Sequence, residues 1–274
     1  MKIKTLLLCL AVGMLAQPLS AQKKKDNPTS TTTNITTPVT PGGDDDLFEV
    51  QKKVYQQALR YGDFNTAAVA LNYVVALKPE KREYKDTLAL VYSELGANVQ
   101  ALSVAKDILS TNSNNAPMLE VAANSEESLG LIKEALEDYE KLFKLSGKTY
   151  HMYKIASMQY YLKRFGECAA TLNGLLNAKD VGTEKITMNY DRQRQDVPLS
   201  AAVYNMRGML ALEQKDYKIS RDNFNEALKI MPDFYLAKGN LGLVDKMEAE
   251  KNGTATPLAP SNNGSTSPKK TGGK

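Results

Sequence analysis

Apolar and small residues recur along the middle of the chain with a period of 34 residues. The clearest unit ends at Pro232, and aromatic, small and aliphatic residues stand at fixed positions before it. A period of this length predicts stacked pairs of helices, because one pair alone cannot bury its apolar stripe. Positions 4, 8, 11, 17, 20, 24, 27 and 32 of this unit are Tyr204, Gly208, Ala211, Tyr217, Ser220, Phe224, Ala227 and Pro232.

The same frame fits four earlier segments of the chain. Pro79 ends one of the second helices, because proline cannot continue a helix interior. Gly62, Gly96 and Gly130 stand at the turn between the two helices of a unit, where glycine tolerates a positive φ. We therefore expect units near residues 48–81, 82–115, 116–148, 149–182 and 201–234, followed by a capping helix at 235–250.

This pattern resembles the tetratricopeptide repeat (TPR), with Tyr204 in place of the usual Trp and Ser220 in place of the usual Ala. The resemblance covers residues 47–250 and implies an all-α, right-handed superhelical solenoid of helix-turn-helix pairs. Small residues at positions 8 and 20 would lie where the two helices of a unit cross. Cys168 occupies position 20 of the fourth unit, so we expect an inert thiol in the core.

The step from the fourth unit to the fifth is 52 residues, and the 18 additional residues fall within 178–199. This stretch is polar without a sustained apolar period, and no strand is predicted anywhere in the chain. Insertions in repeat proteins fall in loops on one face, often the binding face. The segment is thus either a tolerated surface loop or a partner contact. The second interpretation rests on side chains suited to hydrogen bonding a partner: Arg192, Gln193, Arg194 and Gln195.

Residues 1–21 have the composition of an export signal. Two lysines precede an apolar run from Leu6 to Ala16, and small residues precede the expected cleavage after Ala21. That run is too short for a permanent membrane anchor, which needs about 20 residues, and no later segment qualifies. The junction resembles bacterial signal peptides. We therefore expect export to the periplasm, the cell envelope or the outside.

Residues 22–46 and 251–274 are rich in Thr, Ser, Pro, Gly and Lys. They have too few apolar side chains to offset their chain entropy, so we expect a disordered linker and a disordered tail. The acidic run Asp44–Asp46 is suited to the start of the first helix, because carboxylates stabilise the N-terminal end of the helix dipole.

Composition gives little support to catalysis or to nucleic-acid binding. Removal of the two lysines in the signal lowers the formal net charge from +4 to +2, which leaves no basic field to gather nucleic acid. His151 is the single histidine, and Cys168 would be the single cysteine after cleavage, so no Cys/His metal site can form within one chain. We expect no enzyme and no cofactor. His151 is expected at the surface or in a groove, and Glu126 and Asp138 on a solvated face with local pairs to Lys133 or Lys141.

The concave face of the solenoid is the candidate binding surface. In TPR proteins, positions 2, 5, 9, 12 and 13 of each first helix line this groove. The fourth unit places a cluster of tyrosines there, and tyrosine is enriched in binding hot spots, although the same rings could simply pack the helices. Position 9 lacks the residues of the family's carboxylate clamp. The candidate residues are Asn124, Tyr150, Tyr153, Ser157, Tyr160, Tyr161, Asn205 and Met209.

Together these features predict an exported scaffold or adaptor that binds a protein or peptide in a bacterial envelope assembly. The alternative is an accessory solute-binding or regulatory subunit that recognises peptide or glycan fragments. The sequence leaves self-association open.

Overall fold

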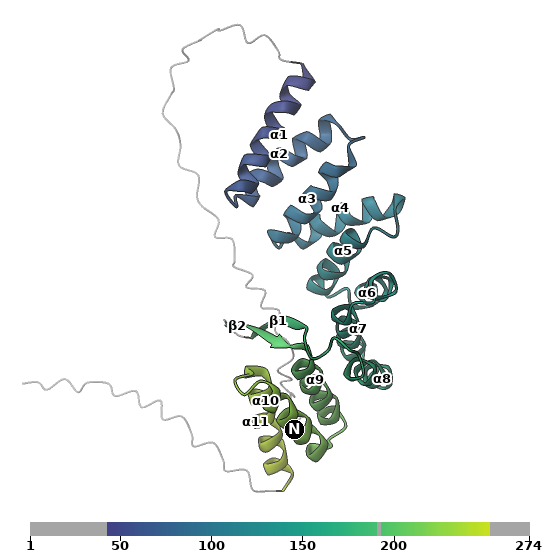
Figure 1. Ribbon diagram of the computed structural model, residues 1–274, viewed down its shortest axis with the longest axis vertical. Coiled ribbons are helices and arrows are strands. Elements are labelled where there is room, and N and C mark those ends of the chain that lie inside the picture. The colour runs from purple at the N-terminus through teal and green to yellow at the C-terminus, as the bar shows by residue number, and fades with distance from the viewer. Residues whose placement is uncertain (1–42, 191–192, 253–274) are drawn as a thin grey trace, which may run out of the picture.

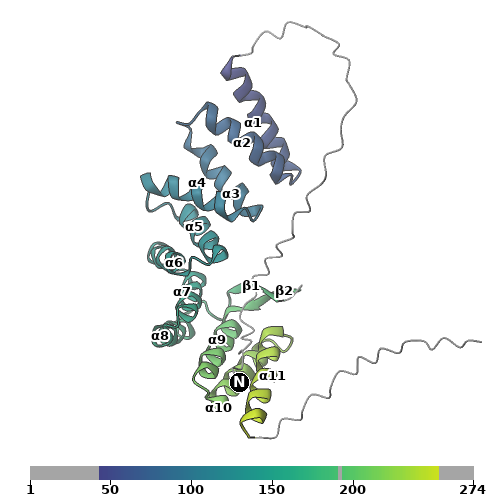
Figure 2. The same ribbon diagram turned by 180° about the vertical axis from the view of Figure 1, so that it is seen from behind.

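The computed structural model describes residues 43–190 and 193–252. The expected export signal, nearly all of the linker and tail, Cys9 and Arg192 lie outside these residues. The described part contains eleven helices and one two-stranded hairpin. Figures 1 and 2 show the helices stacked in chain order along one curved solenoid.

Ten of the helices form antiparallel pairs, and α11 (Tyr235–Lys251) follows the last pair. The second helices α4, α6 and α8 lie along the outer side of the curve (Figure 1). The five pairs are α1 (Asp44–Arg60) with α2 (Phe64–Leu77), α3 (Arg82–Glu94) with α4 (Asn98–Thr111), α5 (Ala116–Leu129) with α6 (Ile132–Ser146), α7 (Thr149–Tyr161) with α8 (Phe165–Leu176), and α9 (Leu199–Glu213) with α10 (Tyr217–Ile230).

The turns between paired helices repeat one backbone conformation. Gly62, Gly96 and Gly130 have φ values of 71°, 65° and 77°, which confirms the prediction from their spacing. Lys163 and Lys215 stand at the same position of the last two units and also have positive φ, 58° and 60°. The geometry of the turn is therefore kept even where its glycine is absent.

Small residues fill the crossing point of each helix pair. The Ser220 hydroxyl donates a hydrogen bond to the Gly208 carbonyl at 2.8 Å, and the Phe224 ring packs so closely that a Cβ on Gly208 would lie 2.5 Å from it. Cys168 is buried as predicted, and burial raises the pKa of its thiol to about 12. The residues at position 20 of the five units are all fully buried: Ala67, Ala101, Ala135, Cys168 and Ser220.

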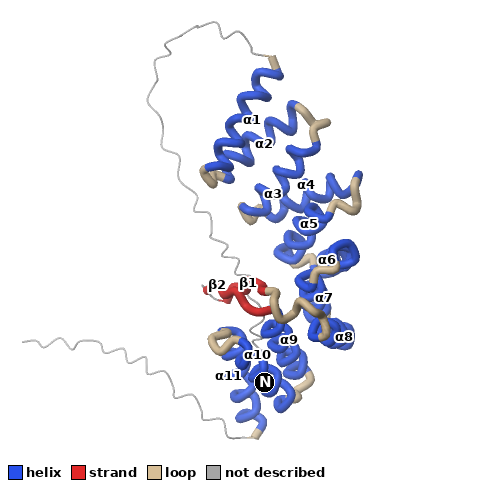
Figure 3. The backbone as a smooth tube through the Cα atoms, in the orientation of Figure 1, coloured by secondary structure: helices blue, strands red, loops and turns tan. Residues whose placement is uncertain are grey.

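The expectation of a chain without strands is wrong. The insertion forms an antiparallel hairpin of β1 (Lys185–Tyr190) and β2 (Gln193–Pro198), shown in red in Figure 3. Ile186, Met188 and Val197 are buried, while Thr187 and Asn189 are exposed. This alternation has the period of two that a half-buried strand requires, but it extends over only six residues in each strand.

The buried side of the hairpin belongs to the core of the last two units. It packs in one cluster with residues of α7, α8, α9 and α11, including Leu172, Val203 and Leu236. The backbone N–H of Leu199 donates to the carbonyl of Glu184 at 2.8 Å, and that of Ser200 donates to Val181 at 3.1 Å. The insertion is therefore a packed part of the fold and not a loop on its surface.

Candidate partner-binding surface

The concave face differs between its two halves. At position 9 of the first helices, Gln56 is exposed and Leu90 has 47% of its surface exposed. Asn124 is half-buried, Ser157 is buried and Met209 is half-buried. The face is therefore open along the first two units and closes toward the fourth and fifth.

The closed half contains a small cavity of about 10 Å³ between α7, β1, α9 and α11. Such a volume holds about one water molecule. Met188 of the hairpin and Leu236 of α11 line this cavity together with residues of the predicted groove. The structure thus brings together five of the predicted residues, but around a space too small for a peptide side chain or a sugar: Tyr153, Ser157, Tyr160, Asn205 and Met209.

The tyrosine cluster divides into buried and accessible members. Tyr153 and Tyr160 have only 5% and 7% of their surface exposed, and the Tyr160 hydroxyl donates to Glu213 Oε1 at 3.0 Å. Burial raises the pKa of Tyr153 well above its ordinary range. Tyr150 and Tyr161 are half-buried. Tyr153 and Tyr160 are thus packing residues, and Tyr150 and Tyr161 keep surface for a partner.

A polar network joins α5, α6 and α7 on the same face. The Tyr139 hydroxyl lies 2.7 Å from Asn124 Oδ1 and 2.8 Å from Glu127 Oε2, and the Lys154 ammonium donates to that carboxylate oxygen at 2.8 Å. Lys154 Nζ also lies 5.8 Å from the ring centroids of both Tyr139 and Tyr150. Burial alone would lower the pKa of Lys154, but the adjacent Glu127 carboxylate stabilises the ammonium form more strongly. The pKa of the lysine is therefore raised. Asn124 is therefore engaged within the chain.

The hairpin residues also bond within the chain. The Gln195 amide donates to the Asp233 carbonyl at 2.8 Å, and its oxygen accepts from the Tyr235 backbone N–H at 3.1 Å. Gln195 thus fixes the hairpin to the turn before α11. Gln193 pairs with Tyr190 next to the turn of the hairpin, and Arg194 is exposed.

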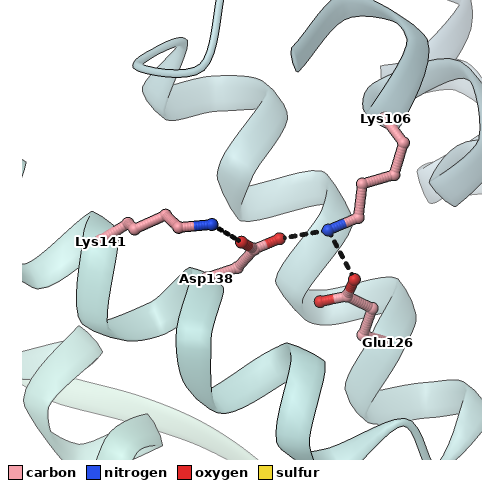
Figure 4. Close-up of polar contacts among 4 residues, drawn as sticks. All are labelled: Lys106, Glu126, Asp138 and Lys141. Atoms are coloured by element: carbon pink, nitrogen blue, oxygen red, sulfur yellow. Dashed lines mark hydrogen bonds and ion pairs between the residues drawn. The ribbon is translucent and has the colours of Figure 1, made fainter. Parts of the chain in front are cut away.

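The expectation of a solvated acidic face at Glu126 and Asp138 is wrong. These side chains have only 1% and 2% of their surface exposed, and both pair with the Lys106 ammonium at 2.7 Å (Figure 4). Asp138 also accepts from Lys141 at 2.9 Å, as its spacing predicts. Burial raises the pKa of Glu126, although Lys106 opposes the shift. Lys106 precedes Glu126 by 20 residues and Asp138 by 32 residues. The spacing of the two acids along their own helices therefore could not identify this lysine as their partner.

The expectation that His151 lies at the surface or in a groove is also wrong, since only 2% of it is exposed. Its Nδ1 lies 2.8 Å from the Ser146 hydroxyl, while Nε2 has no hydrogen-bond partner within the described residues. Burial lowers the pKa of the ring. His151 stands at position 3 of its unit, where the side chain packs against the preceding pair of helices.

The described residues contain no cluster of three or more His, Cys, Asp or Glu that could hold a metal ion. None of their helices is long and apolar enough to cross a membrane.

Solved TPR structures share this architecture at low sequence identity. A tetratricopeptide repeat protein from Parabacteroides merdae superposes with a TM-score of 0.60 at 16% identity, and the match covers 76% of each chain. MamA from Desulfovibrio magneticus gives a TM-score of 0.56 at 12% identity over 69% of this chain and 98% of that one. Another MamA crystal structure gives 0.55 at 13% identity over 68% and 92%.

No family model and no curated protein sequence matches the chain. The structural matches, the repeat period and the buried small residues at position 20 nevertheless agree. The chain has the tetratricopeptide-repeat fold.

Proposed function

We propose that this chain is an exported, non-enzymatic scaffold that holds a protein or peptide partner in a bacterial envelope assembly. The observation that carries the proposal is the shape of the concave face: an extended open surface over the first units beside a cavity of only about 10 Å³. A surface of this kind suits an extended or helical peptide better than a small solute. Residues 1–21 and the Thr/Pro-rich segment after them support export and tethering.

The partner would bind along the open half and reach as far as the fourth unit. Leu90 offers exposed apolar surface at the centre of this path, and Tyr150 offers a half-buried ring beside the Lys154 ammonium. Aromatic and apolar anchors surrounded by polar groups are typical of binding hot spots. Tyr161, which is half-buried, and Arg194, which is exposed on the hairpin, are further candidate contacts.

Affinity capture from an envelope extract of the source cell tests the proposal. The bait is the chain expressed without residues 1–21, compared with Leu90→Asp and Tyr150→Ala on the open face. Val99→Asp is the matched control, because Val99 lies on α4 with 64% of its surface exposed. We expect one protein to be retained by the original chain and by the control, and to be depleted at least about tenfold by the open-face variants.

Retention of the same protein by all baits would mean that the partner does not bind the concave face. Absence of any specific protein would contradict the scaffold itself, and binding of peptide or glycan fragments by the chain would then favour a solute-binding subunit. Tyr153 and Tyr160 are unsuitable as probes, because truncating these buried rings damages the core.

A further inference from the structure

Positions 3 and 7 of each unit mark where one helix pair stacks on the next. The first helix of every later unit contacts the second helix of the unit before it. At position 3 the side chains of units two to five and of α11 are buried, with 7%, 1%, 2%, 0% and 0% of their surface exposed: Tyr84, Met118, His151, Val203 and Ala237. At position 7, Leu88, Ala122 and Ile155 are likewise buried.

The first unit also has apolar residues at these positions, but here they are exposed. Val50 and Val54 have 54% and 36% of their surface exposed, and Leu47 and Tyr61 have 41% and 73%. Residues spaced by three, four and seven positions share one face of a helix, so the three residues of α1 and Tyr61 at its C-cap form a single stripe. Within the described residues, nothing stands where a preceding helix would cover this stripe.

The opposite end of the solenoid is built differently. The exposed residues of α11 are mostly polar or glycine and include Lys238, Gly242, Lys246 and Glu250, with Tyr235 as the single large apolar side chain exposed on this helix. A polar outer face is what a capping helix needs for solubility, and α1 lacks one. The apolar end therefore has no matching apolar surface at the other end of the same molecule, and head-to-tail stacking of copies would pair an apolar face with a polar one.

We propose that the exposed stripe of α1 binds the α1 helix of a second copy of this chain, antiparallel and about a twofold axis near Val54. A patch that matches only itself gives an isologous, closed dimer instead of a filament. In this arrangement Leu47 lies against Tyr61 of the second copy, and Val54 against its own counterpart.

The charges beside the stripe favour the antiparallel direction. Asp46 lies in the first turn of α1 and Arg60 in the last, and both are exposed on the flank of the stripe. Antiparallel pairing places each Asp46 beside Arg60 of the other copy, whereas parallel pairing would leave the two residues about 21 Å apart along the helix axis. Lys53 lies near the axis opposite its counterpart, and its long side chain extends into solvent.

A contact through one helix from each copy is smaller than a standard interface of about 800 Å² per partner. We therefore expect a reversible dimer that forms at micromolar concentrations. Sedimentation velocity over a concentration series measures it in the chain without residues 1–21. The original chain and the control Val99→Asp should approach twice the monomer mass, and Val50→Asp/Val54→Asp should remain monomeric with unchanged helical circular dichroism.

Two further variants test the geometry itself. Asp46→Arg and Arg60→Asp should each weaken the dimer by about threefold or more, and the double variant should restore it, because only antiparallel pairing brings these residues together. Val54→Cys should form an intermolecular disulfide under mild oxidation, while Val99→Cys should not. The native Cys168 is fully buried and does not interfere.

A chain that stays monomeric at the highest concentration overturns the proposal, and slow thiol labelling of Val54→Cys in that monomer would then assign the stripe to residues 22–42 of the same chain. Dimers that persist in Val50→Asp/Val54→Asp place the contact elsewhere and also overturn it. The dimer is measured by mass and partner capture by retention, so failure of this inference is distinct from failure of the proposed scaffold.

Discussion

The two halves of the solenoid differ in how their helix pairs are packed together. Most of the last two units, the hairpin and α11 share one large apolar cluster, whereas the first three units and one side of α7 are divided among three smaller clusters. The joint between the second and third units also contains a buried ionic contact, in which Lys106 meets Glu126 and Asp138. The insertion thus packs the last two units into one core and fills their part of the concave groove. The first units keep an open concave face.

The attachment of the hairpin explains this difference. Thr149 at the start of α7 is hydrogen bonded to the Glu184 carboxylate, and the carbonyl of Glu184 accepts from Leu199 at the start of α9. The segment therefore links the fourth and fifth units directly, where the regular period is interrupted. Its apolar face fills the space that this interruption creates.

The largest effect on stability is expected from Val197→Asp, a substitution in the core that the hairpin shares with the last two units. Val197 is fully buried and pairs with Ile186 in the hairpin. A carboxylate there has no partner in place, so we expect a loss of about 3–5 kcal/mol in the free energy of unfolding. Urea denaturation followed by circular dichroism measures the loss.

Asn189→Asp on the exposed side of the same hairpin is the control and should change stability by less than about 0.5 kcal/mol. Equal effects of the two substitutions would mean that the hairpin does not pack on the solenoid. An unfolding transition that splits in two in Val197→Asp would show that the two halves unfold separately.

A smaller effect is expected from Lys106→Met in the open half. This substitution keeps the apolar stem of the lysine but leaves two buried carboxylates without their shared cation. Because the Lys106 side chain is 45% exposed and water can reach the site, we expect a loss of about 2 kcal/mol at pH 7, below the value for a fully buried pair. The control Lys141→Met removes a more exposed partner of Asp138 and should cost less than about 1 kcal/mol.

The pH dependence of Lys106→Met follows from the same carboxylates. Burial already raises the pKa of Glu126, and without Lys106 it rises further. The folded variant then binds more protons than the unfolded chain, so its stability falls as pH rises from about 4 toward neutrality. A stability deficit that is independent of pH would contradict the assignment of the loss to these acids.

The repeat was predictable because its signal is a period shared by many residues. The small residues at position 20 and the glycine turns follow from close packing and backbone sterics, and these local rules give the same answer in every unit. Cys168 could be placed in the core for this reason alone. The exposed stripe of Val50 and Val54 obeys the same pattern, so the sequence shows that they are stacking positions without showing what covers them.

The candidate site was less predictable because it depends on a break in the period. A six-residue alternation such as Lys185–Tyr190 is too short to stand out as a strand, and its consequence for Tyr153 and Tyr160 arises only when the hairpin packs against them. Glu126 and Asp138 were misassigned for a related reason. Spacing along one helix reveals local partners such as Lys141, but not a lysine from a neighbouring pair of helices.

The smallest effect concerns His151, at the joint between the two halves. The side chain is buried against the preceding units, and burial lowers its pKa, partly offset by Glu120 and Glu184 and reinforced by Lys148. The unfolded chain therefore binds the proton more readily than the folded one. Stability contributed by the neutral ring is fully present above the ordinary pKa of about 6.5 and is lost as pH falls from that value through the lowered pKa of the folded state.

His151→Met tests this dependence, because Met118 fills the corresponding position of the third unit. Urea denaturation between about pH 7.5 and 5.5 should show a decline in stability for the original chain that the variant lacks. The raised pKa of Glu126 gives a pH dependence of opposite sign, but Glu126 is present in both chains and its contribution cancels in their difference. Since the chain has one histidine, a pH dependence of stability that persists in His151→Met cannot come from an imidazole. That result would mean that protonation at this position does not affect the contact between the two halves.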